Sequence, residues 1–306
     1  MIQARVIQST GSWYIVDTGS ELVHCRLPGR FRLNDKKLTN PVAVGDLVDI
    51  NRNKDGTGGI EKIHDRVNYI TRQATHGKRG EHILVSNLDY AFVVQSIQKP
   101  KLKEGFVDRF LVTCEAYDVK PAIIINKMDL ASESDIDFLS NLLAVYEKLE
   151  YPVFLTSIED LDSLDELKET LSGNTSAFIG PSGVGKTSLL NTIDPEYNLK
   201  VGAVSESSNK GKHTTTFAQL IPLNSGGYLV DTPGIREFGL VNIEPWELSL
   251  FFPEMLEPRQ RCRFNTCTHI HEPGCGVIKA YEEGIIDVNR YNSYINMLES
   301  IEAKSF

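Results

Sequence analysis

The stretch SAFIGPSGVGKTSLL (residues 176–190) decides the fold of this 306-residue chain. Its apolar start predicts a strand, its centre GPSGVGKTS (180–188) matches the G-x-x-x-x-G-K-[ST] pattern, and its end predicts a helix. In this order the backbone N–H groups of the turn and of the first helical residues face one point, which favours an anion. The stretch therefore predicts a phosphate-binding loop (P-loop) inside an α/β domain.

The residue types in this loop suit a nucleotide with bound Mg²⁺. Lys186 supplies a positive charge for the β- and γ-phosphates, and the Thr187 hydroxyl is a ligand for Mg²⁺. A glycine-rich turn formed by chance is the alternative, and the strand before it and the helix after it disfavour that alternative. The predicted phosphate contacts are Gly180, Pro181, Ser182, Gly183, Val184, Gly185, Lys186, Thr187 and Ser188.

A second motif, NKMD (126–129), follows the apolar run PAIII and predicts the base. The Asp129 carboxylate can accept hydrogen bonds from N1–H and N2–H₂ of guanine, whereas adenine would leave it unpaired; this disfavours an ATPase or an adenine-specific kinase. Lys127 is predicted to lie over the ring, and Asn126 to tie this loop to the P-loop. The predicted base contacts are Asn126, Lys127, Met128, Asp129, Thr156 and Ser157.

A third motif, DTPG, follows the apolar run YLV (228–230). The strand predicted there would bring Asp231 to the same edge of the sheet, where it would hold Mg²⁺ through water. The Gly234 N–H would meet the γ-phosphate. D-x-x-G alone is a weak pattern, and its place after a strand strengthens it.

The loop KGKHTTT (210–216) is predicted to be a switch, because a threonine there would complete the Mg²⁺ shell when the γ-phosphate is present. Chemistry alone leaves Thr214 and Thr215 open. Ile235 stands where other GTPases carry a water-orienting Gln, and an aliphatic side chain cannot orient water. His213 is predicted to orient the water instead, and Lys212 or a bound RNA or protein are the alternatives. His213 could also be a solvated loop residue without a catalytic role.

The motifs stand in an unusual order, with the base reader before the P-loop. Strands pair in space, so a permuted chain can build the same site. Alternating strand and helix patterns from residue 87 onward predict a mostly parallel sheet with flanking helices. In this order DTPGIREFG (231–239) runs directly into the C-terminal segment, so a change at the γ-phosphate would pass to that segment.

Residues 1–68 show short strand patterns separated by Gly, Asn and Asp turns, which predict an OB-like β-barrel. A barrel that only supports its neighbour is the alternative to one that binds RNA. The polar, basic stretch TRQATHGKRGEH carries no periodicity and predicts a linker. The predicted domains are 1–68 (barrel), 69–86 (linker), 87–240 (circularly permuted P-loop GTPase) and 241–306 (helical, zinc-binding).

The C-terminal segment contains CRFNTCTHIHEPGC (262–275), whose thiols and imidazoles suit tetrahedral Zn²⁺. With three thiolates and one imidazole the site has no open position, so one structural zinc per chain is predicted. The spacing C-x₄-C-x-H-x₅-C is not a common finger spacing, and unligated thiols are the alternative. The predicted ligands are Cys262, Cys267 and Cys275, with His269 and His271 competing for the fourth place.

Composition sets limits on partners and compartment. The net charge of −9 argues mildly against nucleic acid, yet residues 25–38 are locally basic (Arg26, Arg30, Arg32, Lys36 and Lys37). The first residues show no long apolar run, so neither a signal peptide nor a membrane span is predicted. Cys25 and Cys114 lie in apolar patterns and are predicted to be inert, which with the few cysteines favours the cytoplasm.

Together these motifs resemble the RsgA (YjeQ/YloQ) family of circularly permuted GTPases, over nearly the whole chain. The residues that carry the resemblance are NKMD, GPSGVGKTS, GKHTTT, DTPGIREFG and CRFNTCTHIHEPGC. The resemblance implies GTP hydrolysis stimulated by the small (30S) ribosomal subunit during its late maturation, with rRNA contacts from the barrel and the zinc domain. It also favours Thr215 in the switch and His269 as the fourth zinc ligand, and it points to the basic residues Arg259, Arg261 and Arg263.

The predicted function is therefore a GTP hydrolase used as a timer: GTP-bound it docks on the subunit, and hydrolysis releases it. His213, Lys186 and Thr215 are the predicted catalytic residues, Thr187, Thr215 and Asp231 the predicted Mg²⁺ ligands, and a monomer without membrane contact is expected. A rival is an RNA- or protein-binding module in which GTP only stabilises one shape, a possibility that Ile235 raises. A metal-binding regulator with a decayed nucleotide site conflicts with the intact motifs.

Overall fold

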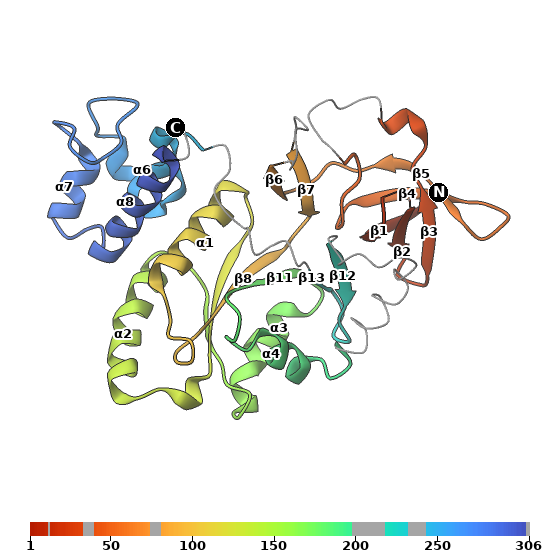
Figure 1. The fold of residues 1–306 in the computed structure, drawn as a ribbon, viewed down its shortest axis with the longest axis horizontal. Helices are drawn as coiled ribbons and strands as arrows, with labels where there is room; N and C mark the ends of the chain where they lie inside the picture. The colour runs from red at the N-terminus through yellow and green to blue at the C-terminus, as the bar shows by residue number, and fades with distance from the viewer. Residues whose placement is uncertain (12, 33–39, 74–80, 198–217, 232–242, 304–306) are drawn as a thin grey trace.

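The chain forms a β-barrel, a central sheet with helices and a helical C-terminal part, in that order from red to blue in Figure 1. The computed structural model describes residues 1–11, 13–32, 40–73, 81–197, 218–231 and 243–303. Among these residues, no helix combines the length and the apolar character needed to span a membrane.

The barrel is built from strands whose side chains alternate between core and surface. The strands are β1 (Ile2–Ser9), β2 (Trp13–Asp17), β3 (Leu22–Arg26), β4 (Leu47–Arg52) and β5 (Gly58–Ile63), with η1 (Gly29–Arg32) after β3. They run in the order β1-β2-β3-β5-β4, and β4 pairs back with β1 to close the barrel. Inward-facing Val6, Val16, Val48 and Ile60 are fully buried. The predicted OB-like barrel is confirmed.

The predicted linker is wrong in one respect, because part of it is a β-hairpin. Strands β6 (Tyr69–Gln73) and β7 (Glu81–Ser86) pair antiparallel on either side of residues 74–80, which lie outside the described part of the chain. Ile70, Leu84 and Val85 are buried in the core of the central domain, and this burial holds two strands that also carry several polar residues.

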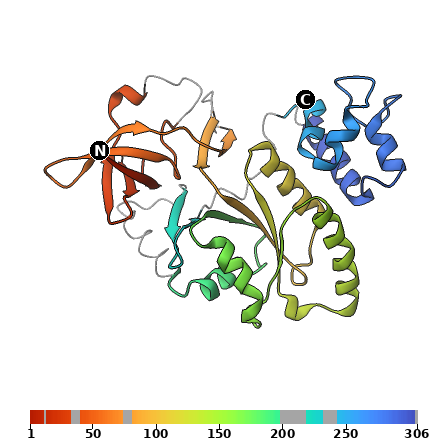
Figure 2. The same ribbon diagram turned by 180° about the vertical axis from the view of Figure 1, so that it is seen from behind.

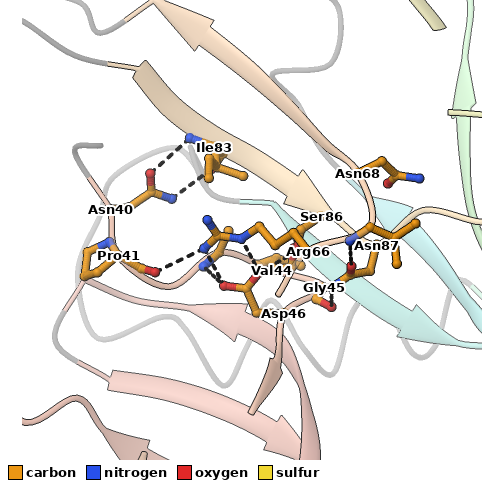
Figure 3. Close-up of polar contacts among 12 residues, drawn as sticks. Asn40, Pro41, Val44, Gly45, Asp46, Arg66, Asn68, Ile83, Ser86 and Asn87 are labelled. Atoms are coloured by element: carbon orange, nitrogen blue, oxygen red, sulfur yellow. Dashed lines mark hydrogen bonds and ion pairs between the residues drawn. The ribbon is translucent and has the colours of Figure 1, made fainter. Parts of the chain in front are cut away.

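A buried polar network fastens the barrel to β7 (Figure 3). Asp46 is fully buried and accepts hydrogen bonds from Arg66 Nε (2.7 Å) and from Ser86 Oγ (2.6 Å). The Asn40 side chain donates to the carbonyl of Ile83 (2.8 Å) and accepts from its N–H (3.0 Å). The barrel is therefore held to the hairpin by hydrogen bonds that water cannot easily replace.

The central sheet runs in the order β10-β9-β8-β11-β13-β12. Figure 1 labels its strands β8, β11, β13 and β12. Its strands are β8 (Tyr90–Ser96), β9 (Pro121–Asn126), β10 (Val153–Leu155), β11 (Thr175–Ile179), β12 (Gln219–Pro222) and β13 (Tyr228–Asp231). All neighbours pair in parallel except β12, which is antiparallel to β13. The predicted mostly parallel sheet is confirmed.

Helices cover both faces of this sheet. They are α1 (Glu104–Ala116), α2 (Glu133–Lys148), α3 (Asp165–Leu171) and α4 (Lys186–Ile193), with the short turns η2 (Met128–Leu130) and η3 (Leu161–Leu164). Phe110 and Leu139, from α1 and α2, lie in the apolar core on one face of the sheet. Leu167 and Leu189, from α3 and α4, lie in the core on the other face.

The barrel and the central sheet are continuous through β1 and β12. Gln8 pairs with Gln219 across these two strands, so one sheet extends through both domains. The Arg5 guanidinium donates to Thr175 Oγ1 (3.0 Å), which adds a side-chain contact at the start of β11. Because β12 follows the predicted switch loop along the chain, the barrel borders the strand that leaves that loop.

The C-terminal part is helical, as the sequence predicts. Its elements are η5 (Pro245–Phe251), α6 (Pro253–Arg259), α7 (Gly276–Glu282) and α8 (Val288–Glu302). Figures 1 and 2 both show these helices beside α1. Val112 of α1 belongs to the same apolar core as Leu248, Phe252 and Tyr294, so the C-terminal core includes a residue of the central domain.

Candidate nucleotide site and metal centre

The P-loop connects β11 to α4 and curves closely past β8. A Cβ on Gly180 would lie 2.2 Å from the carbonyl oxygen of Val94, so no other residue fits without moving the strand. Gly185 has φ of +96° and precedes the first residue of α4, a backbone conformation that side chains disfavour. The loop geometry thus explains two of the glycines in the motif.

Lys186 points back into its own loop. Its Nζ donates to the carbonyl oxygens of Gly180 (2.8 Å) and Pro181 (2.7 Å), which places the ammonium group within the curve of the loop. Thr187 and Ser188 follow in the first turn of α4 and are exposed. A positive charge and a free helix start therefore meet where an anion can enter.

The NKMD loop is bonded directly to the P-loop. Asn126, which ends β9 and is buried, donates from Nδ2 to the carbonyl oxygen of Val184 (3.0 Å). Lys127 has a left-handed backbone (φ 63°), and its Nζ donates to the carbonyl oxygen of Gly183 (2.6 Å). Thr156 Oγ1 donates to Asn126 Oδ1 (3.1 Å) and so fixes the orientation of the Asn126 amide.

Asp129 is exposed beside the end of β10, and its carboxylate is oriented by Ser157. Ser157 Oγ donates to Asp129 Oδ1 (2.5 Å) and accepts from the Glu159 N–H (3.1 Å). Among the described residues, the second carboxylate oxygen of Asp129 has no hydrogen-bond partner. That oxygen and the remaining lone pairs of the first are available to N–H donors of a base.

The described motifs meet at the carboxyl edge of the parallel strands, where ligands of such sheets bind. β13 pairs in parallel with β11, so the backbone of Asp231 ends next to the strand that leads into the P-loop. The side chain of Asp231 and the residues His213, Thr214, Thr215, Gly234 and Ile235 lie outside the described part of the chain.

Sequence reasoning missed residues 96–103, which lead from the end of β8 to the start of α1 and contact both loops. The carbonyl oxygen of Lys99 accepts from Lys127 Nζ (2.5 Å), and Gln98 Nε2 donates to both carboxylate oxygens of Asp135 (2.9 and 3.0 Å). Hydrogen bonds from Ser132 and Gln98 lower the pKa of Asp135 to about 2. The only signal in the sequence is the S-x-x-D capping pattern at Ser132.

The predicted metal ligands converge in the C-terminal part. Donor atoms of Cys262, Cys267, His269 and Cys275 all lie within 4.8 Å of one another. His269 Nδ1 lies 3.3 Å from Cys275 Sγ and 3.5 Å from Cys262 Sγ, and these two sulfur atoms are 3.8 Å apart. Such a Cys₃His cluster can hold a metal ion.

The backbone around the cluster favours thiolates. The N–H groups of Gly276 and Ile278 point at the sulfur atoms of Cys262 (3.3 Å) and Cys275 (3.4 Å). Burial raises the pKa of Cys267 to about 12, so a bound cation is needed to keep this thiol deprotonated at neutral pH.

Of the two histidines that compete in the sequence, His269 lies in the cluster. It is buried, and Ser249 Oγ lies 3.0 Å from its Nε2. Ser249 can therefore accept a hydrogen bond from the Nε2–H group, which leaves the Nδ1 lone pair for a metal. Burial lowers the pKa of His269 to about 4, which keeps the ring neutral. His271 is exposed, two residues further on.

Comparison with known proteins identifies the family. The family model described as "RsgA GTPase" matches residues 63–241, and the one described as "RsgA N-terminal domain" matches residues 3–60. The chain is a GTPase of the RsgA family. Among RsgA relatives, the "Small ribosomal subunit biogenesis GTPase RsgA" of Phocaeicola vulgatus is 44% identical over 302 residues, covering 98% of this chain and 97% of that protein. The protein of the same name from Bacteroides fragilis is 43% identical over 302 residues, with the same coverage.

Two solved structures share the fold. YjeQ from Thermotoga maritima has a TM-score of 0.80 at 35% identity, covering 97% of each chain. YloQ, described as a circularly permuted GTPase, has a TM-score of 0.78 at 32% identity, covering 99% of this chain and 96% of its own. The reversed motif order is thus a property of the RsgA fold.

Proposed function

We propose that this RsgA-family chain hydrolyses GTP as a timer in late maturation of the small (30S) ribosomal subunit. In this proposal the GTP-bound chain docks on the subunit, the subunit stimulates hydrolysis, and the GDP-bound chain leaves. The names of the relatives, which are small ribosomal subunit biogenesis GTPases, support this role. The proposed chemistry rests on one observation: Asn126 and Lys127 of the NKMD loop donate hydrogen bonds to the P-loop. The loop predicted to bind the base and the loop predicted to bind the phosphates therefore form one site.

In the proposed site the described loops divide the nucleotide between them. Asp129, oriented by Ser157, reads guanine, and Lys186 exchanges its contacts with the loop carbonyls for the β- and γ-phosphates. Thr187, Thr215 and Asp231 hold Mg²⁺, and the Gly234 N–H meets the γ-phosphate. His213 positions the attacking water, with Lys212 or a group of the bound subunit as alternatives. The choice of Thr215 over Thr214 follows from the resemblance to the RsgA family, and the other assignments follow from residue chemistry and spacing.

We infer that the metal of the Cys₃His cluster is zinc, one per chain, with a structural role. For a Zn–S bond of about 2.3 Å, a tetrahedron has S···S edges of about 3.8 Å. The Cys262–Cys275 separation of 3.8 Å fits this edge. Four protein ligands leave no open position for substrate, so the ion would hold the fold rather than take part in hydrolysis.

The proposed contacts with rRNA come from local basic residues, because the net charge is −9. On the barrel, Arg26 stacks on the Trp13 ring at 4.1 Å, which presents a cation beside an aromatic surface. In the C-terminal part, Arg259, Arg261 and Arg263 flank the first metal ligand.

We propose that the chain acts as a cytoplasmic monomer, without a membrane partner, and that its domains are divided near residues 68, 86 and 240.

Multiple-turnover GTPase assays with and without purified small subunits test this function. Stimulation by the subunit, together with tighter co-sedimentation in a non-hydrolysable GTP analogue than in GDP, is the expected result. A chain that binds GTP but shows no turnover with the subunit would favour the rival, a binding module in which GTP stabilises one shape. Ile235 in the usual Gln position is the observation behind that rival.

A further inference from the structure

The segment 96–103 connects the nucleotide site to the rest of the molecule. It bonds to the base loop twice, because the Ile97 N–H donates to the Asn126 carbonyl oxygen (3.0 Å) and the Lys99 carbonyl oxygen accepts from Lys127 Nζ (2.5 Å). It also lies against the P-loop, since a Cβ on Gly183 would be 3.8 Å from Pro100 Cδ. A displacement of this segment must therefore move both nucleotide loops.

Helix α1 begins where this segment ends, and its first turns reach the C-terminal part. Glu104 opens the helix and accepts from Asn289 Nδ2 of α8 (3.1 Å). One turn later Asp108 is 1% exposed and accepts from Arg290 Nη1 (2.8 Å) and from Ser293 Oγ (2.5 Å), both of α8. Tyr146 of α2 donates to the same carboxylate (3.0 Å).

Arg290 is shared between Asp108 and the C-terminal part itself. It is 2% exposed, and its Nε and Nη2 donate to the two carboxylate oxygens of Glu254 on α6 (2.7 and 3.2 Å). Burial alone would lower the pKa of Arg290, but the Glu254 and Asp108 carboxylates raise it above its ordinary value. The arginine is therefore a fixed cation with one anionic partner in its own domain and one on α1.

Separating α1 from α8 would break the hydrogen bonds that Arg290 and Ser293 donate to the Asp108 carboxylate, a loss that is unfavourable for a pair buried in this geometry. Outside this ion pair, Arg109 Nη2 donates to Ser300 Oγ (3.2 Å), and Val112 is buried in the C-terminal core. These contacts join the C-terminal helices to α1, which also packs on the central sheet through Phe110. A displacement of the C-terminal helices therefore acts on α1 and, because α1 continues directly from residues 96–103, on that segment.

We propose that Asp108 and Arg290 are positioning residues, which through α1 couple the placement of the C-terminal domain to the guanine and phosphate loops. This inference rests on the proposed function, in which the C-terminal domain contacts the small subunit. It adds a second connection to the covalent one through residues 232–242. A subunit that displaces the C-terminal domain would in this way change nucleotide affinity, and bound nucleotide would change subunit affinity by the same factor.

The test compares the two carboxylate partners of Arg290, which are Asp108 and Glu254. Asp108→Asn removes the charge that ties α1 to α8, while Glu254 keeps Arg290 paired inside the C-terminal domain. Glu254→Gln is the matched control, because it removes a charge from the same network and leaves the tie to α1. For each full-length variant, subunit affinity is measured with a GTP analogue and with GDP, beside metal content and the midpoint of thermal unfolding.

We expect the wild-type affinity ratio between the two nucleotide states to lie at about 5- to 150-fold. In Asp108→Asn the ratio should fall to less than about half of the wild-type value, because only the covalent connection remains, with metal content retained, whereas Glu254→Gln should keep the wild-type ratio. A ratio preserved in Asp108→Asn, or lost equally in Glu254→Gln, overturns the coupling through α1 and leaves the proposed function standing. A wild-type ratio of one overturns the proposed function and this inference together.

If Asp108→Asn loses its metal or has a lower midpoint of thermal unfolding, a measurement on the wild-type chain tests the coupling instead. Amide hydrogen exchange of residues 97–103 is then measured with the GTP analogue, with and without the small subunit. The coupling requires the exchange rates in this segment to change by several-fold on docking. Unchanged rates there, beside changed rates in the C-terminal helices, overturn the inference.

Discussion

Ser157 Oγ donates a 2.5 Å hydrogen bond to Oδ1 of Asp129, across 28 residues of chain. The hydroxyl is itself held by the Glu159 N–H (3.1 Å), so its proton is committed to the carboxylate. The proposed base reader therefore meets guanine with its plane already set. Orientation of this kind removes part of the entropy cost of binding, which is the physical basis of the prediction for Ser157.

Asp129→Asn should weaken guanine binding and admit xanthine. The amide presents a donor toward the guanine N2–H₂, whereas xanthine has a carbonyl there that can accept. Two charge-assisted hydrogen bonds of about 1.5–3 kcal/mol each are lost, so we expect GDP affinity to fall ~100-fold or more. Fluorescence titration with GDP and xanthosine diphosphate measures this. Wild-type GDP affinity without any gain for xanthosine diphosphate would show that Asp129 does not read the base.

Ser157→Ala should lower GDP affinity by about tenfold or less, equal to about 1.4 kcal/mol, because Asp129 then has to be oriented by guanine alone. Hydrolysis at saturating GTP should change little, since Ser157 is remote from the P-loop lysine. Ser140→Ala, which removes an exposed helical hydroxyl on α2, is the control. Equal GDP affinity in the two variants would contradict the proposed role of Ser157.

Lys186→Ala should abolish hydrolysis. The bonds from Lys186 Nζ to two carbonyl oxygens of its own loop are lost in the variant, but the bond from Asn126 Nδ2 to the Val184 carbonyl still holds the P-loop backbone. What is lost is the positive charge on the transferred phosphoryl group. Single-turnover assays with radiolabelled GTP measure the step directly, and circular dichroism checks the fold. Full turnover in this variant would refute the assignment of the P-loop.

Much of the fold could be predicted because the local signals agree with the tertiary structure. The P-loop and the NKMD loop each follow a buried apolar strand, and their residue types are set by the ligand. The hairpin β6–β7 could not be predicted in the same way. The apolar run Ile83-Leu84-Val85 is only three residues long and Ile70 stands beside polar residues, so the burial of Ile70, Leu84 and Val85 in the central core is what makes these segments strands.

The contacts between domains were beyond sequence reasoning. Asp108 and Arg290 are 182 residues apart, and no local pattern pairs them. The one available signal is that Asp108 interrupts the apolar run of an amphipathic helix, which indicates a buried carboxylate that needs a partner. The choice between His269 and His271 likewise depends on which ring the fold buries.

Zinc should be found at one ion per chain by mass spectrometric metal analysis. Cys262→Ser and Cys275→Ser should each lose the metal and destabilise the C-terminal helices, while nucleotide binding is kept, because the P-loop and the base loop belong to another core. His269→Ala should release the metal as well.

His271→Ala is the matched control for the metal centre, since His271 is exposed and two residues away. It should retain zinc and the wild-type unfolding midpoint. Metal loss in His271→Ala but not in His269→Ala would show that the wrong ligand was chosen. Metal-free protein after careful purification would end the proposal of a structural zinc.

The permuted order of the motifs leads to a prediction about the covalent connection between DTPG and the C-terminal domain. DTPG lies directly upstream of the C-terminal domain, so contacts of its backbone with the γ-phosphate should shift that domain relative to the central sheet. A coupling free energy of about 1–3 kcal/mol corresponds to a 5- to 150-fold change in partner affinity.

Hydrogen exchange should therefore differ between the GDP and GTP-analogue states in residues 203–216, in residues 231–240 and at the start of the C-terminal domain. The barrel should change little, because the buried hydrogen bonds of Asp46 with Arg66 and Ser86 hold it to β7. Identical exchange in both nucleotide states, with equal subunit affinity, would mean that the γ-phosphate moves nothing, and the timer would have to be abandoned.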